Sequence, residues 1–484
     1  MNTGEAPGYE FEVPRGPRHA SGPRHAIGHD SLRQLQAPAE PAPRASVRAA
    51  SSGVLDVMRK RNWLMGLAAP IMAAIAVGVA VVVVAGGGGN NGAAPSALAA
   101  GFPPARPAGA VFTGSAGTSR VVLSAIGAAA ATEVAAGGVN GRPALWTSSN
   151  GGTDWTRAVL DGPAPLIRAA TGQLAGVTHG PAGWLAVGTT LAGTGGPLVA
   201  SSANARTWTV TGGIAGLGAG DTVAAAVTAG AGGYVIVGHH TLGNSGLAVA
   251  TAWYAPGLTG WQRAAVSTAT GPQGASGGDI QMMNAVTATT AGFTAVGATG
   301  TGPAAWLSAT GRKWQQVQVP APAGSTRAAL NYVAANGGDV VATGTEFSAA
   351  GASSPFAEVS ATGGATWAQV RLPVPDIGPG TGTTVTALTA AGGGFTAVGT
   401  YVTEAGPEVV VWTLPPGTPV TDGTAWTAVT PQGTGLASGS SENAITALAA
   451  DGATLTGVGF TARLTSSGTP GPQAPTLWQS PIRY

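Results

Sequence analysis

The sequence of 484 residues contains no cysteine, and charged residues make up only 9% of it. The absence of cysteine excludes a disulfide framework, a thiolate nucleophile and a cysteine-ligated zinc site. Lysine and arginine together number 22 and aspartate and glutamate 20, so the formal net charge is only +2. This near balance excludes a strongly basic nucleic-acid-binding protein, and we expect no nucleic-acid partner.

Glycine, proline and small apolar residues are abundant instead. The chain has 79 glycines and 35 prolines, and 44% of its residues are hydrophobic. Such a composition is typical of short strands and turns in which small side chains pack closely. The length ordinarily predicts two or three domains, and changes in composition divide the sequence into four parts.

Residues 1–61 form the first part, which is rich in proline and charge and contains the near-repeats Gly16–Ala20 and Gly22–Ala26. This part has neither helical nor strand periodicity, and it cannot bury enough apolar surface to offset its conformational entropy. We therefore expect a disordered tail, and the segment that follows places this tail in the cytoplasm.

An uncharged run of 23 residues, 63–85, follows the tail. As a helix it would be roughly 34 Å long, enough to cross a hydrocarbon core of about 30 Å, so we predict one transmembrane helix over 62–86. Arg59, Lys60 and Arg61 precede the run, whereas the next cation is Arg106. By the positive-inside rule the N-terminus is cytoplasmic and the C-terminal part lies outside. A cleaved signal peptide is the alternative, but its apolar region usually has only about 7–15 residues.

Residues 87–107 are rich in glycine, alanine and proline, and they are predicted to form a flexible linker. The alanine- and glycine-rich, lysine-poor composition of the chain resembles that of secreted proteins from high-GC bacteria. We therefore expect a single-pass protein of a bacterial plasma membrane with an extracytoplasmic C-terminal domain.

Residues 108–484 contain seven copies of one repeat. Tryptophans recur at intervals of 53 residues, and once more after an insertion, at Trp155, Trp208, Trp261, Trp314, Trp367 and Trp426. A second series precedes them at Trp146, Trp253, Trp306 and Trp412, with Val199 in the matching place of the second repeat. Each copy also has a short apolar strand that ends in glycine, at Gly137, Gly188, Gly238, Gly297, Gly344, Gly399 and Gly459.

Each copy is predicted to form four short strands, A to D, because apolar runs of five or six residues alternate with Gly/Ser/Thr turns and no helical stretch intervenes. A period near 50 residues with four strands per unit is typical of a propeller blade. We therefore predict an all-β, seven-bladed β-propeller over 108–484, and we expect it to be monomeric.

Closure of the ring requires a strand from the other end of the repeat array. The last copy reaches its third strand at Thr476–Ser480 and has no fourth strand. Since an open ring would expose two strand edges, we expect Gly109–Thr113 to pair as the outer strand of the last blade. Phe102 is an alternative by spacing, but Pro103 and Pro104 disfavour a strand there.

The turns between strands C and D share a motif, in the segments Ser148–Trp155, Ser201–Trp208, Ser308–Trp314 and Ser360–Trp367. This motif resembles the Asp-box, or bacterial neuraminidase repeat, of sialidase-like propellers. Other residues replace its aspartate, namely Asn150, Ala203, Thr310 and Thr362. The resemblance implies the propeller fold, with the motif tryptophans packed between adjacent sheets, and it assigns no activity.

A sialidase-like or other hydrolase is the alternative function to a binding module. Sialidase-like propellers use an arginine cluster, a tyrosine nucleophile with a glutamate, and an acid, whereas retaining or inverting glycosidases need a pair of carboxylates about 5–10 Å apart. The acids that could supply a pair are Asp279, Glu346, Asp376, Glu404 and Glu408, but no spacing marks a pair. His239 and His240 are the only adjacent histidines, and no third ligand is near in sequence, so we predict no metal site and no cofactor.

The B–C and D–A loops lie on one face of a propeller, and here these loops vary most in length and sequence, at 239–246, 345–354, 400–406, 266–281, 372–382 and 430–442. Variable loops on a rigid frame usually bind ligands. The candidate binding residues on this face are His239, His240, Asp279, Glu346, Asp376, Tyr401 and Glu404.

The sequence therefore predicts a membrane-anchored module that binds a protein or a cell-wall glycan. A transmembrane sensor whose basic tail contacts a cytoplasmic partner is a further alternative. Two carboxylates and an arginine in the central mouth would favour the enzyme, whereas a mouth lined by alanine, glycine and threonine would favour the binding module.

Overall fold

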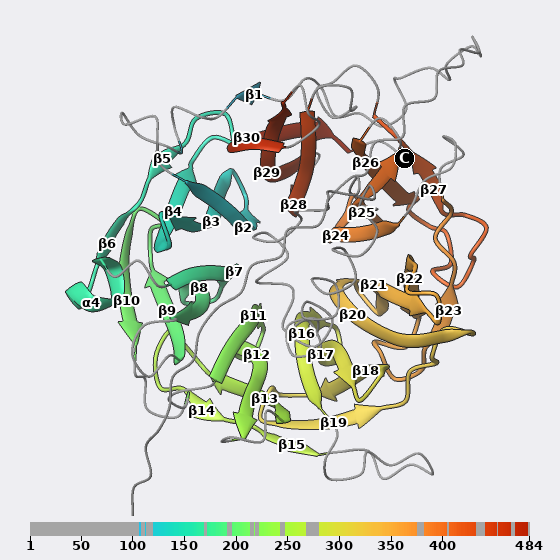
Figure 1. Ribbon diagram of the computed structural model, residues 1–484. Coiled ribbons are helices and arrows are strands. Elements are labelled where there is room, and N and C mark those ends of the chain that lie inside the picture. The colour runs from blue at the N-terminus through green and yellow to red at the C-terminus, as the bar shows by residue number, and fades with distance from the viewer. Residues whose placement is uncertain are drawn as a thin grey trace, which may run out of the picture. The chain divides into compact units, whose positions relative to one another are not determined.

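Seven mainly antiparallel sheets are arranged around a central axis in the computed structural model (Figure 1). The structure describes residues 106–107, 112, 120–168, 172–190, 196–212, 217, 222–242, 247–267, 280–374, 382–403, 406–431, 441–452, 454–465 and 470–482. The predicted all-β, seven-bladed propeller is confirmed. The predicted tail, the helix over 62–86 and the linker up to residue 105 lie outside these residues, among which no helix is both long and apolar enough to span a membrane.

Strands A to D of each blade follow one another from the axis outward. Blade 1 consists of β2 (Val121–Ala129), β3 (Thr132–Val139), β4 (Arg142–Ser148) and β5 (Thr156–Arg157), and blade 2 of β7 (Gly172–Gly180), β8 (Gly183–Thr190), β9 (Gly196–Ser202) and β10 (Thr207–Gly212). Blade 3 consists of β11 (Thr222–Gly230), β12 (Gly233–Leu242), β13 (Leu247–Ala255) and β14 (Gln262–Arg263), and blade 4 of β16 (Gln281–Thr289), β17 (Gly292–Thr299), β18 (Gly302–Ser308) and β19 (Lys313–Val317).

Blades 5 and 6 follow the same order, and blade 7 takes its outer strand from the N-terminal side of the array. Blade 5 consists of β20 (Ser325–Asn336), β21 (Asp339–Ser348), β22 (Ser353–Ser360) and β23 (Ala368–Val370), and blade 6 of β24 (Thr383–Ala391), β25 (Gly394–Thr403), β26 (Gly406–Leu414) and β27 (Thr427–Val429). Blade 7 consists of β28 (Ser441–Asp451), β29 (Thr454–Leu464), β30 (Pro470–Pro481) and β1 (Arg106–Pro107).

The connections after blades 1 and 3 add a fifth strand to the blade that follows. The strand β6 (Val159–Asp161) pairs in parallel with β10, and β15 (Ala265–Ser267) pairs in parallel with β19. A short helix, α4 (Ala164–Arg168), continues the first of these connections. Both connections thereby cover the outer edge of a sheet, where unpaired backbone groups would otherwise be exposed.

The glycine that ends strand B in every copy has a steric cause. A β-carbon at Gly297 would lie only 1.8 Å from the carbonyl oxygen of Met282, and the other six glycines of the series meet the equivalent oxygen at 1.9–2.1 Å. In each blade strand A has a β-bulge at this point, as between Met283 and Ala285, where Asn284 is the extra residue. Glycine is required because the bulge brings the two backbones into contact.

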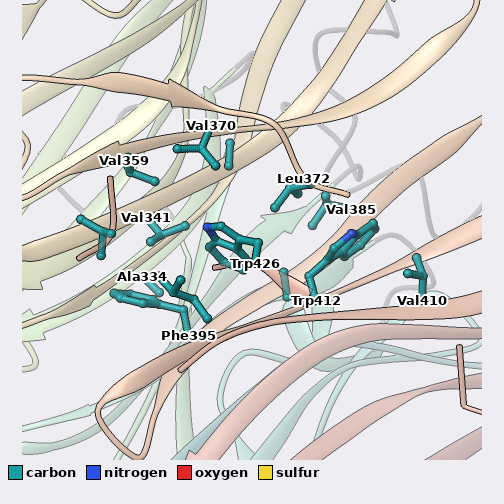
Figure 2. Close-up of a cluster of buried hydrophobic side chains, with 14 of the residues drawn as sticks. Ala334, Val341, Val359, Val370, Leu372, Val385, Phe395, Val410, Trp412 and Trp426 are labelled. Atoms are coloured by element: carbon teal, nitrogen blue, oxygen red, sulfur yellow. The ribbon is translucent and has the colours of Figure 1, made fainter. Parts of the chain in front are cut away.

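Hydrophobic side chains form seven clusters, one between each pair of adjacent blades. Figure 2 shows the cluster between blades 5 and 6, in which Trp426 lies near Val341 and Val370, and Trp412 lies near Val385. The six tryptophans of the 53-residue series each pack at a different interface. The prediction that they are inter-blade core residues is therefore confirmed.

The closing strand differs from the predicted one. Arg106 and Pro107 pair with Leu477 and Thr476, so the outer strand of blade 7 lies just before the predicted segment Gly109–Thr113. Proline is tolerated here because the strand is at the edge of the sheet. Phe112 instead packs edge-on against Trp146, with ring centroids 5.2 Å apart, at the interface between blades 7 and 1.

Two blades lack the buried tryptophan of strand C. The strand register places Ala200, not Val199, opposite Ala186 at this position in blade 2, which corrects the sequence alignment. In blade 5 the position belongs to Glu358, opposite Ala342. The interface between blades 4 and 5 thus contains a carboxyl group where five other blades bury an indole ring.

The glycine requirement gives a stability prediction. Gly297→Ala is expected to destabilise the fold by about 1–3 kcal/mol or more, because the new methyl group overlaps the carbonyl of Met282. Gly232→Ala is the matched control, since no atom lies within 4 Å of the position that its β-carbon would take and the change also removes backbone entropy from the unfolded chain. Denaturant unfolding measures both, and equal stability of the two variants would contradict the steric explanation.

Candidate functional site

The extra residues of the seven bulges form a ring around the axis. They are Ser124, Ala175, Ala225, Asn284, Asn331, Thr386 and Thr446, and each lies thirteen residues before the repeating glycine of its blade. In five blades the bulge residue is the fourth residue of strand A, and in blades 5 and 7, where strand A is longer, Asn331 and Thr446 lie near the middle of the strand. A bulge redirects the side chain of its extra residue, so these positions determine the chemistry of the axis.

Several bulge residues link neighbouring blades. Thr446 Oγ1 donates a hydrogen bond of 2.7 Å to the carbonyl of Leu123, and Thr386 Oγ1 donates one of 2.6 Å to Ile445. Asn284 Nδ2 donates to the carbonyl of Leu330 at 2.9 Å. Each acceptor is the residue just before the bulge of the next blade, so the ring has a directional set of polar contacts.

An axial cavity of about 190 Å³ lies within this ring. It is lined by residues of all seven inner strands, and six of the bulge residues are among them. Polar lining comes from Ser124, Asn284, Asn331 and Thr446, while alanine, glycine and branched aliphatic side chains form most of the remainder. Tyr332 is the one aromatic lining residue, and burial raises its pKa to about 12, so its hydroxyl stays neutral.

The predicted histidine pair lies in a strand, not in the loop expected from the sequence, because β12 continues through Leu242. His239 is buried, and desolvation, together with the neighbouring His240, lowers its pKa to about 4. His240 Nδ1 lies 2.8 Å from Thr222 Oγ1 on strand A of the same blade. The pair therefore belongs to the packed end of blade 3, and the described residues contain no group of three metal-ligating side chains.

The other predicted binding residues belong to separate blades. Glu346 is half-buried on β21 of blade 5, and Tyr401 is buried on β25 of blade 6, where it packs in the cluster between blades 5 and 6. Both were expected in loops, but strand B is longer than predicted in each blade. Asp279, Asp376 and Glu404 lie outside the described residues.

The turns between strands C and D are local hydrogen-bonded structures. Ser148 Oγ accepts from the amide of Gly152 at 2.9 Å, and Asn150 Oδ1 accepts from the amide of Asp154 at 2.9 Å. The indole of Trp155 donates to the carbonyl of Gly152 at 2.9 Å. These bonds satisfy backbone groups within the turn, so the motif has a structural role here.

The equivalent turn in blade 2 is one residue shorter than the sequence alignment indicated. It begins at Ser202, and Asn204 accepts from the amides of Arg206 and Thr207 at 2.9 and 3.0 Å. Asn204, and not Ala203, therefore accepts the backbone hydrogen bonds of this turn. In blade 6 Asp422 itself has this role, and its hydrogen bonds from Thr424 lower its pKa.

Among the described residues three carboxyl groups are buried, those of Glu133, Glu358 and Glu442, and the first two lie within the apolar interfaces between blades. Glu358 is fully buried and neither oxygen has a hydrogen-bond partner among the described residues, so desolvation raises its pKa to about 8. Burial raises the pKa of Glu133 to about 6, although Thr456 donates a 2.8 Å hydrogen bond to it. Glu133 and Glu358 are not among the residues that line the axial cavity.

No family model matches the chain, and no curated protein matches its sequence. Similar solved structures include YCF48 bound to D1 peptide, with 10% identity, a TM-score of 0.45, and coverage of 76% of this chain and 93% of that one. An ancestral GH74 enzyme has 12% sequence identity and a TM-score of 0.43, and the match covers 76% of this chain and 48% of that enzyme. The α-L-arabinofuranosidase Arb93A of Fusarium graminearum has 12% sequence identity and a TM-score of 0.41, and the match covers 79% of this chain and 97% of that enzyme.

Sequence reasoning missed the ring of bulge residues, including Asn284 and Asn331. These residues precede the repeating glycine by a constant thirteen positions, but every aligned position of a repeat has a constant offset, so the spacing does not distinguish them. The bulge itself has no sequence signature in strand A, where the extra residue is serine, alanine, asparagine or threonine. Only the structure shows that this position faces the axis.

The buried carboxyl of Glu358 gives a pH prediction. The pKa of Glu358 is 4.5 in the unfolded chain and about 8 in the folded protein. The free energy of unfolding therefore falls as the pH rises from about 4.5 to about 8, because the carboxyl must then lose its proton in a buried site. From about pH 5 to about pH 9, the melting temperature of the wild type should fall several degrees more than that of Glu358→Gln. Glu346→Gln, which removes a half-buried carboxyl from the same blade, is the control. Equal flattening of the pH profile by both variants would contradict the assignment.

Proposed function

We propose that the chain is a membrane-anchored binding module, which presents one face of an extracytoplasmic propeller to a protein or a cell-envelope glycan. The uncharged run 63–85 and the basic triplet before it support the anchor and its orientation. The axial cavity supports the binding role, because it offers hydrogen-bonding groups within a concave, mostly apolar site.

The composition of the cavity wall favours binding over glycoside hydrolysis. Its described lining residues are alanine, glycine, serine, threonine, asparagine, tyrosine and branched aliphatic residues. A glycosidase of the usual kind requires two carboxyl groups at the scissile bond. The lining residues instead provide neutral donors and acceptors, which suit recognition of a ligand without covalent change.

The cavity gives a prediction about binding. Ala225→Leu would add three carbon atoms at a cavity-lining position, and it is expected to abolish capture of the ligand by the purified full-length chain. Binding is measured on a glycan array and by capture from cell-envelope extract, with wild-type and variant chains compared at equal thermal stability. Ala361→Leu, at an exposed turn between β22 and β23, is the control. If Ala225→Leu captures the same components as the wild type, the axial site is not the binding site.

The absence of cysteine permits a direct test of the topology. Ser31→Cys in the tail and Ser149→Cys in an exposed turn of the propeller each give a chain with a single thiol. In intact cells a membrane-impermeant maleimide should label Ser149→Cys and not Ser31→Cys, whereas permeabilised cells should show both labelled. Labelling of both chains in intact cells, or of neither, would contradict the proposed orientation.

A further inference from the structure

Two asparagines of the bulge ring have unused hydrogen-bonding groups at the cavity. Asn284 is 5% exposed, and its Nδ2 donates to the carbonyl of Leu330 at 2.9 Å and to Asn331 Oδ1 at 3.3 Å. Both hydrogens of this amide are therefore used. Asn284 Oδ1 and Asn331 Nδ2 have no partner among the described residues, which leaves an acceptor and a donor side by side on the wall formed by blades 4 and 5.

Hydroxyl groups lie on the opposite side of the ring, on blades 7 and 1. Ser124 Oγ accepts from Gln173 Nε2 at 2.9 Å, so its own hydrogen is available for donation. Thr446 Oγ1 donates its hydrogen to the carbonyl of Leu123 and can accept. The cavity thus has polar groups at two opposed walls, each of which can both donate and accept.

The walls between these polar groups are small and apolar. Blades 2 and 3 place Ala175 and Ala225 there, and Ile126, Val177 and Leu388 also line the cavity. The aromatic ring of Tyr332 lies next to Asn331 in sequence and lines the same space. None of the described lining residues is ionised at neutral pH, so an ion placed here would lose its hydration without gaining a counter-charge.

From this arrangement we infer that the axial cavity binds a single uncharged sugar ring. A sugar ring has hydroxyl groups around its perimeter that donate and accept, and its two faces present C–H groups to apolar and aromatic walls. Pockets for drug-sized ligands enclose about 300–1,000 Å³, so a cavity of about 190 Å³ takes one ring and not several. This inference rests on the proposed binding function and specifies its ligand.

The test uses the purified full-length chain in a sugar-free detergent. Saturation-transfer NMR with glucose, galactose, mannose and N-acetylglucosamine is compared with glucuronate and glucosamine, which have similar rings and a charge. At least one neutral sugar should show saturable binding, and both charged sugars should bind at least about tenfold more weakly. Saturable binding of a charged sugar with equal affinity would overturn the inference, as would failure of every neutral sugar to bind.

Matched asparagine variants locate the sugar. Asn284→Leu and Asn331→Leu keep the number and branching of side-chain heavy atoms and should weaken binding at least about tenfold, because each removes a polar contact with the ligand. Asn336→Leu is the control. Asn336 lies on β20, the strand of Asn331, but it does not line the cavity, and the substitution removes an inter-blade hydrogen bond of 2.7 Å to the carbonyl of Gly393. Ala175→Leu fills the cavity without removing any hydrogen bond, and it should also abolish binding. An equal loss in Asn336→Leu, or full binding by Ala175→Leu, would overturn the site.

The inference can fail while the proposed function stands. If the uncharged, N-acetylated peptide N-acetyl-trialanine amide binds in place of every sugar, and Ala225→Leu loses that binding, the cavity is a binding site with a different ligand. If Ala225→Leu retains every captured component and every sugar, the proposed function fails together with the inference.

Discussion

In each of the seven sheets, a carbonyl oxygen of strand A lies so close to strand B that only glycine can face it. This contact exists because strand A contains one extra residue, which bends the innermost strand and turns its own side chain toward the axis. The close approach therefore shapes the innermost strand of every blade and creates the ring of side chains that lines the cavity. The glycines are invariant among the blades, from Gly137 to Gly459, because backbone atoms leave no space for a β-carbon.

The interfaces between blades are less uniform than the bulges. Most bury a tryptophan from strand C or strand D, whose large apolar surface stabilises the contact between sheets. Glu358 replaces such a tryptophan in blade 5, and Glu133 occupies a position where the other blades have aromatic or aliphatic residues such as Phe293 and Leu455. Burial without a full set of hydrogen bonds makes both carboxyl groups unfavourable in their charged form. The ring thus has two interfaces whose stability depends on pH, one of them at the point of closure.

The fold could be predicted from the sequence because its determinants recur. Tryptophans at a fixed spacing and glycines at the ends of strand B mark seven units, and the missing outer strand of the last unit indicates closure from the N-terminal side. The closing strand was misplaced by a few residues, since Phe112 was assigned to pairing and instead packs against Trp146. An aromatic residue in an apolar segment satisfies either role by sequence pattern, and only the packing distinguishes them.

The candidate site could not be predicted in the same way, because binding residues on a repeat frame are the residues that do not repeat. Charged and aromatic residues after strand B, such as His239 and Tyr401, were expected in loops, yet the hairpins continue past them and bury them. The residues that face the axis are neutral and differ between blades, so neither charge nor periodicity identifies them. The bulge fixes their backbone position through the opposing glycine and places no demand on their side chains. Blades 4 and 5 can therefore present asparagine while blades 2 and 3 present alanine, and this freedom at a fixed position is what allows one symmetrical frame to form an asymmetric cavity.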